Sequence, residues 1–447
     1  MEAAMMFQRK IYQDMLDWKQ TSQGRSALLI QGARRVGKST IVEAFARKEY
    51  ESYLLIDFSS ATTEVRNLFE DIAHLDYFFL HLQLIYGIRL HPRASVIIFD
   101  EVQLCPKARQ AIKHLVKDGR YDYIETGSLL SIRQNIADIL IPSEERRLDM
   151  RPMDYEEFLW AIGDRTTPQL LSMVWEQKTP LGQAAHREQM RKFRLYMLIG
   201  GMPQAVEAYL ATNNFRDIDD VKRDILSLYA DDFHRIDATG RASQIFESVP
   251  AQLSSNTARF QIETALPGVR RDRTAELVAN MADSYTILLA YHANNPDLGM
   301  ALTKNLGAYK MFLLDTGLFI TLIYKDRAFT DNEIYRKLLS DKQHTDLGYV
   351  YENMVAQMTV AKGDALFYYT FPSETSNHHY EIDFLLTRGN KLCPIEVKSS
   401  GYKTHASLDA FQKKYNSRIG HRCLIYTKDL AKTGDIWCVP IYLYPYL

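Results

Sequence analysis

The sequence predicts an α/β protein built in three parts, with a parallel sheet in the first. Up to about Trp160, short apolar runs alternate with helical patterns, as expected for parallel strands that are buried on both faces and separated by helices. From Thr166 to about Leu339 long amphipathic stretches dominate, and after Asp346 strands rich in aromatic and β-branched residues return. We therefore expect an α/β domain over residues 1–162, a helical region over residues 163–340 and a mixed α/β domain over residues 341–447.

Composition excludes several other classes of protein. The chain has 447 residues, about three times the roughly 150 residues of a typical domain. Its 46% hydrophobic and 24% charged content argues against a disordered, collagen-like or disulfide-stapled chain. The 54 basic and 55 acidic residues give a net charge of −1, so any binding to nucleic acid or anionic lipid would have to be local.

The sequence also favours a reducing compartment. The four cysteines are scattered, with no C-x-x-C pair and no histidine at zinc-ligand spacing. The N-terminus lacks the apolar core of a secretory signal, and charged or polar residues interrupt the most apolar stretch, residues 75–90. We expect a cytoplasmic protein with no membrane anchor.

Four strands are expected in the first part and four in the last. Each is a short run of apolar, aromatic or β-branched residues bounded by turn-forming or helical sequence. In the first part they cover Ala27–Ile30, Tyr53–Phe58, Val96–Phe99 and Tyr121–Glu125. In the last part they cover Leu366–Phe371, Ile382–Leu386, Leu392–Val397 and Arg422–Tyr426.

A phosphate-binding loop follows the first strand. Residues 32–39 read GARRVGKS and stand between the strand that ends at Ile30 and a helical run over residues 40–47. The glycines let backbone N–H groups face phosphate oxygens, and the helix N-terminus adds a positive partial charge. Lys38 would reach the β- and γ-phosphates and Ser39 would bind Mg²⁺. The expected ATP-binding residues are Gly32, Ala33, Arg34, Arg35, Val36, Gly37, Lys38, Ser39 and Thr40.

A carboxylate pair ends the third strand. Asp100 and Glu101 directly follow the apolar run Val96–Phe99. We expect Asp100 to hold the Mg²⁺ shell and Glu101 to act as general base or to position water, which is the division of roles in phosphoryl transfer to water. A glutamate that activates water favours hydrolysis, and a small-molecule kinase is the weaker interpretation.

The fourth strand is followed by a candidate sensor of the γ-phosphate. It ends in Thr126, Gly127 and Ser128. In the additional-strand division of P-loop ATPases, a polar residue at this place touches the γ-phosphate or the attacking water, so Thr126 or Ser128 is the candidate. Ser128 could equally cap a helix N-terminus. A cation near the γ-phosphate is also expected, and the sequence does not choose among Arg34, Arg35, Arg133, Arg146, Arg147 and Arg151.

The last part carries a pattern typical of metal-dependent nucleases. Glu396 and Lys398 share a face of one strand, and Asp383 begins the strand before it, across a turn at residues 388–390. Two carboxylates can share a second divalent cation, and Lys398 can orient or deprotonate a water for attack on a phosphodiester. The spacing is that of PD-(D/E)xK nucleases, in which an earlier helix often adds an acidic metal ligand, here Glu352. The alternative is an exposed Glu–Lys pair on an ordinary strand.

DNA is a candidate partner on two grounds. Between Ser243 and Leu289 the sequence suggests three helices, the last opening with an arginine cluster at residues 270–273, as in a helix-turn-helix or winged-helix module. From Lys398 onward, eight basic residues stand against three acidic ones. Ordinary three-helix packing and a solvated basic surface explain the same two patterns.

With these residues placed, the chain resembles a large family of bacterial and archaeal AAA+-type ATPases of unknown physiological role. In that family a P-loop ATPase domain is followed by a helical, winged-helix-like region and a PD-(D/E)xK nuclease-like domain. The matching blocks are GARRVGKST, IIFDEVQLCP, YIETGSLL, RPMDYEEFL, IGGMP, FLLDTGLF, YVYENMV and EIDFLLTRGNKLCPIEVKSS. The resemblance implies nucleotide contacts from Gly32, Gly37, Lys38, Ser39, Asp100 and Glu101. It places Glu352, Asp383, Glu396 and Lys398 on the nuclease-like positions.

Two functions follow from these patterns. The favoured one is a Mg²⁺-dependent ATPase whose hydrolysis cycle changes the disposition of a DNA-binding, nuclease-like module. The alternative is a nucleotide-switched regulator or scaffold, in which the nuclease-like domain binds a partner without cutting it. Near-neutral charge is compatible with a monomer and with a homo-oligomeric ring, and the resemblance leaves the question of cleavage open.

Overall fold

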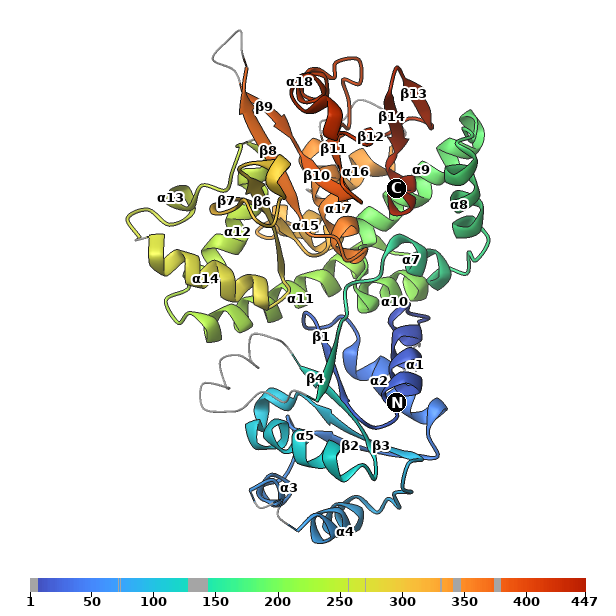
Figure 1. Ribbon diagram of the computed structural model, residues 1–447, viewed down its shortest axis with the longest axis vertical. Helices are drawn as coiled ribbons and strands as arrows, with labels where there is room; N and C mark the ends of the chain where they lie inside the picture. Colours follow the sequence, from blue (N-terminus) through green and yellow to red (C-terminus); the bar gives the residue numbers. More distant parts are fainter. Residues whose placement is uncertain are drawn as a thin grey trace. The chain divides into compact units, whose positions relative to one another are not determined.

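The chain divides into two compact units (Figure 1). The computed structural model describes residues 7–70, 72, 74–127, 144–255, 257–269, 271–329, 332–340, 347–373 and 379–447. Unit 1 comprises Met1–Arg151 together with Asp283–Tyr285, and unit 2 comprises Pro152–Ala282 together with Thr286–Leu447. The chain therefore leaves unit 1 after Arg151, returns at Asp283 and leaves again after Tyr285.

Unit 1 is built on a parallel sheet. Its strands are β1 (Ala27–Gln31), β2 (Ser52–Asp57), β3 (Ser95–Asp100), β4 (Asp122–Gly127) and β5 (Glu145–Asp149). They lie in the order β2-β3-β4-β1-β5, and every neighbouring pair is parallel. The first four confirm the strands expected from sequence to within two residues. The sequence did not predict β5, because its residues ERRLD form an edge strand without an apolar run.

Helices cover both faces of this sheet. They are α1 (Ile11–Ser22), α2 (Lys38–Glu49), α3 (Thr63–Leu68), α4 (Leu75–Tyr86) and α5 (Pro106–Asp118), with a short 3-10 turn η1 (Val102–Leu104). Leu29 and Ile97 pack in one apolar cluster with residues of α4 and α5. Because side chains alternate along a strand, Leu28 and Ile98 face the other side, where α2 contacts the sheet. Burial on both faces explains the continuous apolar runs of β1 and β3.

Unit 2 begins with helices. They are α7 (Tyr155–Ala161), α8 (Thr167–Gln177), α9 (Gln183–Ile199), α10 (Pro203–Thr212), α11 (Phe215–Ile236), α12 (Arg241–Ser254), α13 (Ile262–Ala265) and α14 (Arg271–Asp283). The last three are the helices expected between residues 243 and 289. In the part of the chain that the structure describes, no helix is both long and apolar enough to cross a membrane.

A β-hairpin follows where the sequence predicted further helix. Strands β6 (Ile287–Ala293) and β7 (Lys304–Leu313) pair antiparallel, and β6 lies parallel to β8 (Phe367–Pro372). With β9 (His379–Ile382) they form a sheet in the order β7-β6-β8-β9. The helical expectation was wrong here because a short apolar run such as ILLAYHA does not distinguish a buried strand from a buried helix. Strands from either side of residue 340 therefore share one sheet.

The other sheet of unit 2 contains the predicted hairpin. Its strands are β10 (Phe384–Arg388), β11 (Lys391–Val397), β12 (Arg422–Tyr426), β13 (Ala431–Thr433) and β14 (Ile436–Pro440), in the order β10-β11-β12-β14-β13. β10 and β11 pair antiparallel across Gly389, whose φ of 60° suits a tight turn. Helices α17 (Gly348–Ala361) and α18 (Ala406–Tyr415) both pack on β11. Among the described residues, unit 2 also contains α15 (Thr316–Ile323), α16 (Glu333–Leu339) and the 3-10 helices η2 (Pro296–Leu298), η4 (Asn416–Arg418) and η5 (Ile441–Tyr446).

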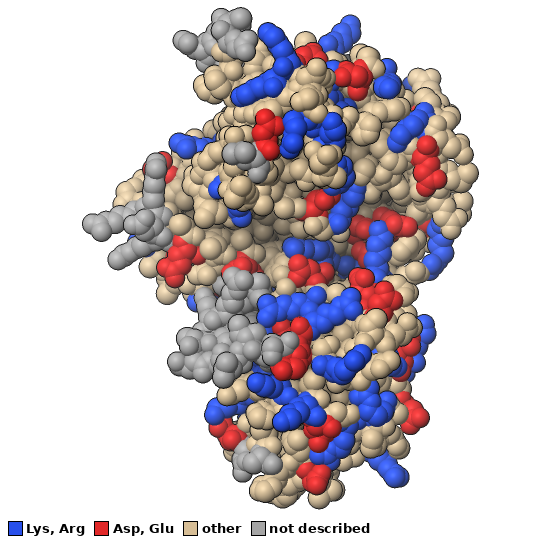
Figure 2. All heavy atoms as spheres, in the orientation of Figure 1, with Lys and Arg blue, Asp and Glu red and all other residues tan. Residues whose placement is uncertain are grey.

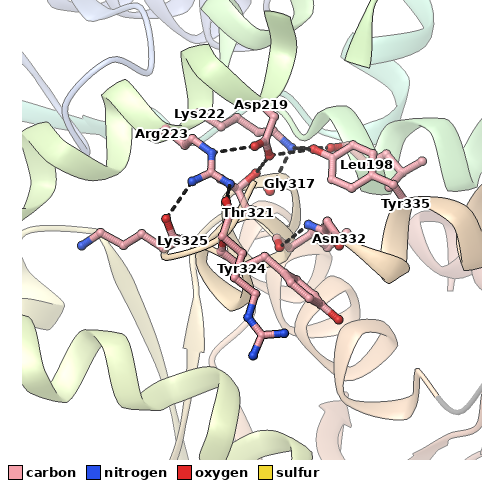
Figure 3. A network of polar contacts seen from close by, with 12 residues as sticks. Leu198, Asp219, Lys222, Arg223, Gly317, Thr321, Tyr324, Lys325, Asn332 and Tyr335 are labelled. Carbon is pink, nitrogen blue, oxygen red and sulfur yellow. Dashed lines mark hydrogen bonds and ion pairs between the residues drawn. The ribbon is translucent and has the colours of Figure 1, made fainter. Parts of the chain in front are cut away.

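A buried polar network ties four of these helices together (Figure 3). The ammonium of Lys222, on α11, is fully buried and donates to the carbonyl oxygens of Leu198 (2.8 Å) and Gly317 (3.2 Å) and to the hydroxyl of Tyr335. Burial lowers the pKa of Lys222 to about 8. One turn away, the carboxylate of Asp219 accepts bonds from Thr321, Tyr335 and Arg223. The network joins α9, α11, α15 and α16.

A second buried contact lies where α9 ends in a glycine pair. Asp315 caps α15 by accepting from Leu318 N at 2.9 Å, and it accepts from Gly201 N at 2.6 Å. A Cβ on Gly200 would lie 2.3 Å from Asp315 Oδ1, and one on Gly201 would lie 2.2 Å from the carbonyl oxygen of Met153. Only glycine allows this close approach, so the pair forms a tight helix terminus.

Candidate functional site

Three sequence motifs of unit 1 meet at the carboxyl edge of its sheet. The glycine-rich loop follows β1, Asp100 is the last residue of β3, and Thr126 is the second-last residue of β4. In open parallel sheets, ligands bind at this edge. The edge is therefore the candidate site.

The loop has the backbone that its glycines predict. Gly37 adopts a φ of 97°, and α2 begins at the next residue, so the loop runs directly into a helix N-terminus. A Cβ on Gly32 would lie 2.2 Å from the carbonyl oxygen of Met150, which closely follows β5. Glycine at position 32 thus lets the loop leave the sheet beside that segment.

The ammonium of Lys38 lies folded against the start of the loop. It donates to the carbonyl oxygens of Gly32 and Ala33, both at 3.0 Å, and the residue is buried. These bonds keep the positive charge beside the backbone that would hold a phosphate. A triphosphate could exchange them for stronger, charge-assisted bonds.

The residues expected to bind Mg²⁺ are in contact. Ser39 Oγ lies 2.9 Å from Asp100 Oδ1, and Thr126 Oγ1 donates to the same carboxylate oxygen. Asp100 and Thr126 are buried, whereas Ser39 is exposed. Mg²⁺ prefers hard oxygen ligands and usually binds one or two protein groups together with phosphate and water. The donor set therefore fits this cation.

Glu101 is held by Gln103, a residue to which no motif assigned a role. Its backbone adopts φ 51° and ψ 46°, a left-handed conformation that is costly for a residue with a Cβ. The side-chain amide of Gln103 donates to Glu101 Oε2, and Glu101 N donates to Thr126 Oγ1 at 3.4 Å. The strained backbone and the amide together fix the carboxylate next to Asp100.

Other predicted residues of this site have varied positions. Ala33 and Val36 are buried in the loop, and Thr40 is exposed on the first turn of α2. Arg34 is half-buried, and Arg35 is exposed with a φ of 68°. Ser128 and Arg133 lie outside the described residues. Arg147 pairs with Glu145 and Arg151 with Asp149, and Arg146 is exposed, so no arginine is assigned to the γ-phosphate.

Arg9 is a further residue that sequence reasoning missed. Its buried guanidinium donates to the carbonyl oxygens of Val36 in the loop (3.1 Å) and of Arg151 (2.5 Å). It stands before α1 and belongs to no motif. Only the tertiary structure brings it to the loop.

In unit 2 two of the predicted metal ligands, Glu352 and Asp383, lie with Glu381 around an internal cation. Lys310, on β7, lies 3.6 Å from Glu352 Oε2 and forms an ion pair with Glu381. Burial opposes its charge, but the carboxylates of Glu352, Glu381 and Asp383 outweigh burial and raise the pKa of Lys310. Burial also raises the pKa of Asp383. The Lys310 ammonium therefore supplies a positive charge among these acidic groups.

Glu396 and Lys398 form a separate pair. Their charged atoms lie 3.0 Å apart, and Lys398 also donates to the carbonyl oxygen of Thr404. Asp383 instead accepts from the backbone N–H of Val397 at 2.8 Å. Among the described residues, no three His, Cys, Asp or Glu side chains are grouped so that they could hold a metal ion. The predicted ligands Glu352, Asp383 and Glu396 therefore do not fit a divalent cation in this arrangement.

The basic surface expected near the C-terminus is largely paired within unit 2. Arg422 bridges Asp409 and Asp435, and Arg418 pairs with Asp297 at 3.4 Å. Lys398 pairs with Glu396, and Lys414 donates to the hydroxyl of Tyr369. Figure 2 shows Lys and Arg side chains interspersed with Asp and Glu on the face that it draws. At least six of the eight basic residues have internal partners, since Lys428 and Lys432 also lie over the rings of Tyr402 and Trp437, and this leaves less charge for phosphate backbones.

Three stretches of the chain match known families. Residues 24–159 match a family described as an AAA domain. Residues 190–328 and residues 347–444 match two domains of unknown function, DUF8612 and DUF4143 respectively. No match is found among curated proteins.

Solved structures similar to this chain share little sequence with it. The Walker-type ATPase PABY2304 of Pyrococcus abyssi is 15% identical, with a TM-score of 0.44 over 71% of this chain and 96% of that chain. The Aeropyrum pernix ORC1 protein in complex with DNA is 11% identical, with a TM-score of 0.30 over 75% and 95%. The Thermotoga maritima RuvB Holliday junction branch migration motor is 11% identical, with a TM-score of 0.28 over 65% and 90%. All three TM-scores are below 0.5, so these likenesses carry no inference about partners.

The AAA match spans all the features of the candidate site. It includes the glycine-rich loop, the Asp100–Glu101 pair and Thr126, and the parallel sheet that positions them. An AAA domain implies a bound nucleotide, with Mg²⁺ as its usual companion. Residues 24–159 therefore match an AAA domain and have an α/β fold suited to binding a nucleotide at the phosphate loop.

Proposed function

We propose that unit 1 binds and hydrolyses ATP with Mg²⁺. The observation that carries this proposal is the 2.9 Å contact between Ser39 Oγ and Asp100 Oδ1, the two groups needed to hold the cation. The position of β4 between β1 and β3 supports assignment to the additional-strand division of P-loop ATPases. The bond from Thr126 on β4 to Asp100 supports Thr126 as the sensor of the γ-phosphate.

Each residue then has a role suited to its surroundings. The loop N–H groups and the Lys38 ammonium bind the β- and γ-phosphates, while Ser39 and Asp100 hold the cation. The cation's charge stabilises the negative charge that develops on the phosphate oxygens. Glu101 accepts the proton of the attacking water, and Gln103 keeps its carboxylate in place.

ATP turnover by single variants tests this assignment. Lys38→Ala should abolish ATP binding in calorimetry, because it removes the charge that pairs with the phosphates. Glu101→Gln should bind ATP but turn it over at least about 100-fold more slowly, as loss of a general base usually does. Lys113→Ala on α5 and Glu64→Gln on α3 make the same chemical changes at exposed positions and should match wild type. Equal turnover in all variants would remove the ATPase proposal.

For unit 2 we propose a binding role, as in a nucleotide-switched regulator or scaffold, in preference to metal-dependent cleavage. The observation that favours this is the Lys310 ammonium, which occupies the acidic cluster where a nuclease would hold its cation. The helices α12, α13 and α14 followed by the β6–β7 hairpin have the element order of a winged helix, which supports such a module in unit 2. DNA and a protein remain the two candidate partners.

Two assays separate these roles. No Mg²⁺- or Mn²⁺-dependent cutting of plasmid, branched or single-stranded DNA is expected, and a product that disappears in Asp383→Ala and Lys398→Ala would overturn the binding role. DNA binding with and without nucleotide is then measured across a salt series. A steep log–log slope would show that phosphates are neutralised and would identify DNA as the partner, whereas a flat response would favour a protein.

A further inference from the structure

The phosphate loop is fixed at its start by the residues through which the chain leaves unit 1. Gln31, the last residue of β1, accepts from Met150 N at 2.7 Å, and its side-chain amide donates to Asp149 Oδ1 at 2.7 Å. Gln31 and Asp149 are also directly paired in the sheet. The backbone just before Arg151 is therefore bonded to the residue that precedes the loop.

The other end of the loop is fixed to the same segment. Arg9 is 6% exposed, and its two terminal nitrogens donate to Val36 in the loop and to Arg151. Val36 immediately precedes Gly37 and the catalytic Lys38. A planar guanidinium holds two acceptors in a fixed geometry, which a lysine does not do. Arg9 therefore connects the part of the loop next to Lys38 with the last residue of unit 1.

The returning chain joins the same cluster. Tyr285 is the last residue of the short segment that belongs to unit 1, and its hydroxyl donates to Asp149 Oδ1 at 2.7 Å. The guanidinium of Arg151 lies 4.5 Å from the centre of the Tyr285 ring. Tyr285 also holds a left-handed φ of 61°, a conformation that persists only when its surroundings enforce it. The chain passes between the units at three points, after Arg151, before Asp283 and after Tyr285, and we call these points the chain crossings. All three lie within or next to one hydrogen-bonded cluster.

We propose that Arg9, Asp149 and Tyr285 are positioning residues that couple the nucleotide state of the phosphate loop to the chain crossings into unit 2. The inference rests on the proposed ATP binding by unit 1. Nucleotide entry draws Lys38 from the carbonyls of Gly32 and Ala33 and reorders the loop. The bonds of Gln31 and Arg9 pass that change to residues 149–151, and Tyr285 passes it to the second crossing.

Hydrogen–deuterium exchange with and without Mg·ATP tests this coupling. The full-length Glu101→Gln chain is the parent, because it should hold ATP without turning it over. ATP should change exchange in the loop and also in segments 152–161 and 274–282 of unit 2. Adding Tyr285→Phe to the parent removes one hydroxyl. The matched control is Tyr77→Phe, which makes the same change at an exposed position of α4. ATP affinity and Tm should stay near the parent values in both.

We expect Tyr285→Phe to weaken the ATP-dependent change of exchange in one segment only. In Tyr285→Phe the ATP response of segment 274–282 should fall about five-fold, the factor that one hydrogen bond typically supplies, while the response of the loop persists. An unchanged exchange response of segment 274–282 in Tyr285→Phe would overturn the coupling. ATP binding by the parent with no change of exchange in unit 2 would do the same. Both outcomes would leave the proposed ATP binding intact. No ATP binding in the parent would overturn the proposed function and the coupling together.

Discussion

Removing the Lys310 ammonium should let the acidic side chains around it rearrange into a divalent-cation site, a grouping that the described residues do not show while Lys310 is in place. Lys310 lies 3.6 Å from Glu352 Oε2, forms an ion pair with Glu381 and is held charged partly by Asp383. Lys310→Ala leaves the three carboxylates without a counter-charge. Breaking a buried ion pair by removing one partner costs about 3–5 kcal/mol, so the variant should be less stable by an amount of this order.

A divalent cation should restore much of that loss. A ligand present at about 100 times its Kd stabilises the folded state by about 2.7 kcal/mol. We therefore expect Mn²⁺ to raise the free energy of unfolding of Lys310→Ala by roughly 2–3 kcal/mol in urea titrations without nucleotide. Electron paramagnetic resonance should show the bound Mn²⁺ directly. Lys304→Ala, at the exposed start of the same strand, should show neither effect.

Two results would refute this reasoning. Lys310→Ala and Lys304→Ala could respond to Mn²⁺ alike, which would mean that the carboxylates do not converge. Alternatively, the wild type could bind Mn²⁺ without nucleotide, and the Asp383→Asn variant could fail to bind it. That outcome would mean that Lys310 moves aside for a metal, and cleavage by unit 2 would again be the better hypothesis.

Three further changes test other contacts. Lys222→Met leaves two buried carbonyls without their donor and should lower the free energy of unfolding by about 2–5 kcal/mol in urea titrations. Because the pKa of Lys222 is about 8 when folded and 10.5 in the reference state, the unfolded chain binds more protons between these values. Wild-type stability should therefore gain up to about 1.4 kcal/mol per pH unit there from this group, a gain that Lys222→Met lacks. Gly200→Ala should cost about 2 kcal/mol or more in thermal unfolding, because its Cβ would lie 2.3 Å from Asp315 Oδ1. Gln103→Leu should lower kcat for ATP about ten-fold with little change in KM, since it releases the carboxylate of Glu101.

The parts of the fold that sequence could predict are those with contiguous signals. β1 and β3 are buried along their whole length, and each contains an unbroken apolar run. The phosphate loop is a local string between a strand and a helix, and the β10–β11 hairpin is two strands around a glycine turn. In each case the physical requirement falls within about ten neighbouring residues, as expected for turns and for βα units.

The residues that sequence could not predict are those whose partners lie far along the chain. Arg9 meets Val36 and Arg151 only after the sheet has formed. Lys310 stands in the strand run AYKMFL, and nothing there indicates that Glu352 and Glu381 will enclose it. The predicted nuclease pattern considered only the acids and Lys398. A cation supplied from another strand changes what those acids can bind.

Three of the sequence blocks that resemble the ATPase family meet at one helix terminus within unit 2. Met153 N donates to the carbonyl oxygen of Gly201 at 2.7 Å, and Gly201 N donates to Asp315, so three blocks that are distant in sequence meet there. Met153 is only two residues beyond Arg151, the acceptor of the Arg9 bond. Under the proposed coupling, a nucleotide-driven shift of residue 151 would therefore act on the packed C-terminus of α9 and not on a flexible linker. This short connection along the chain is what the proposed regulator or scaffold switched by ATP requires.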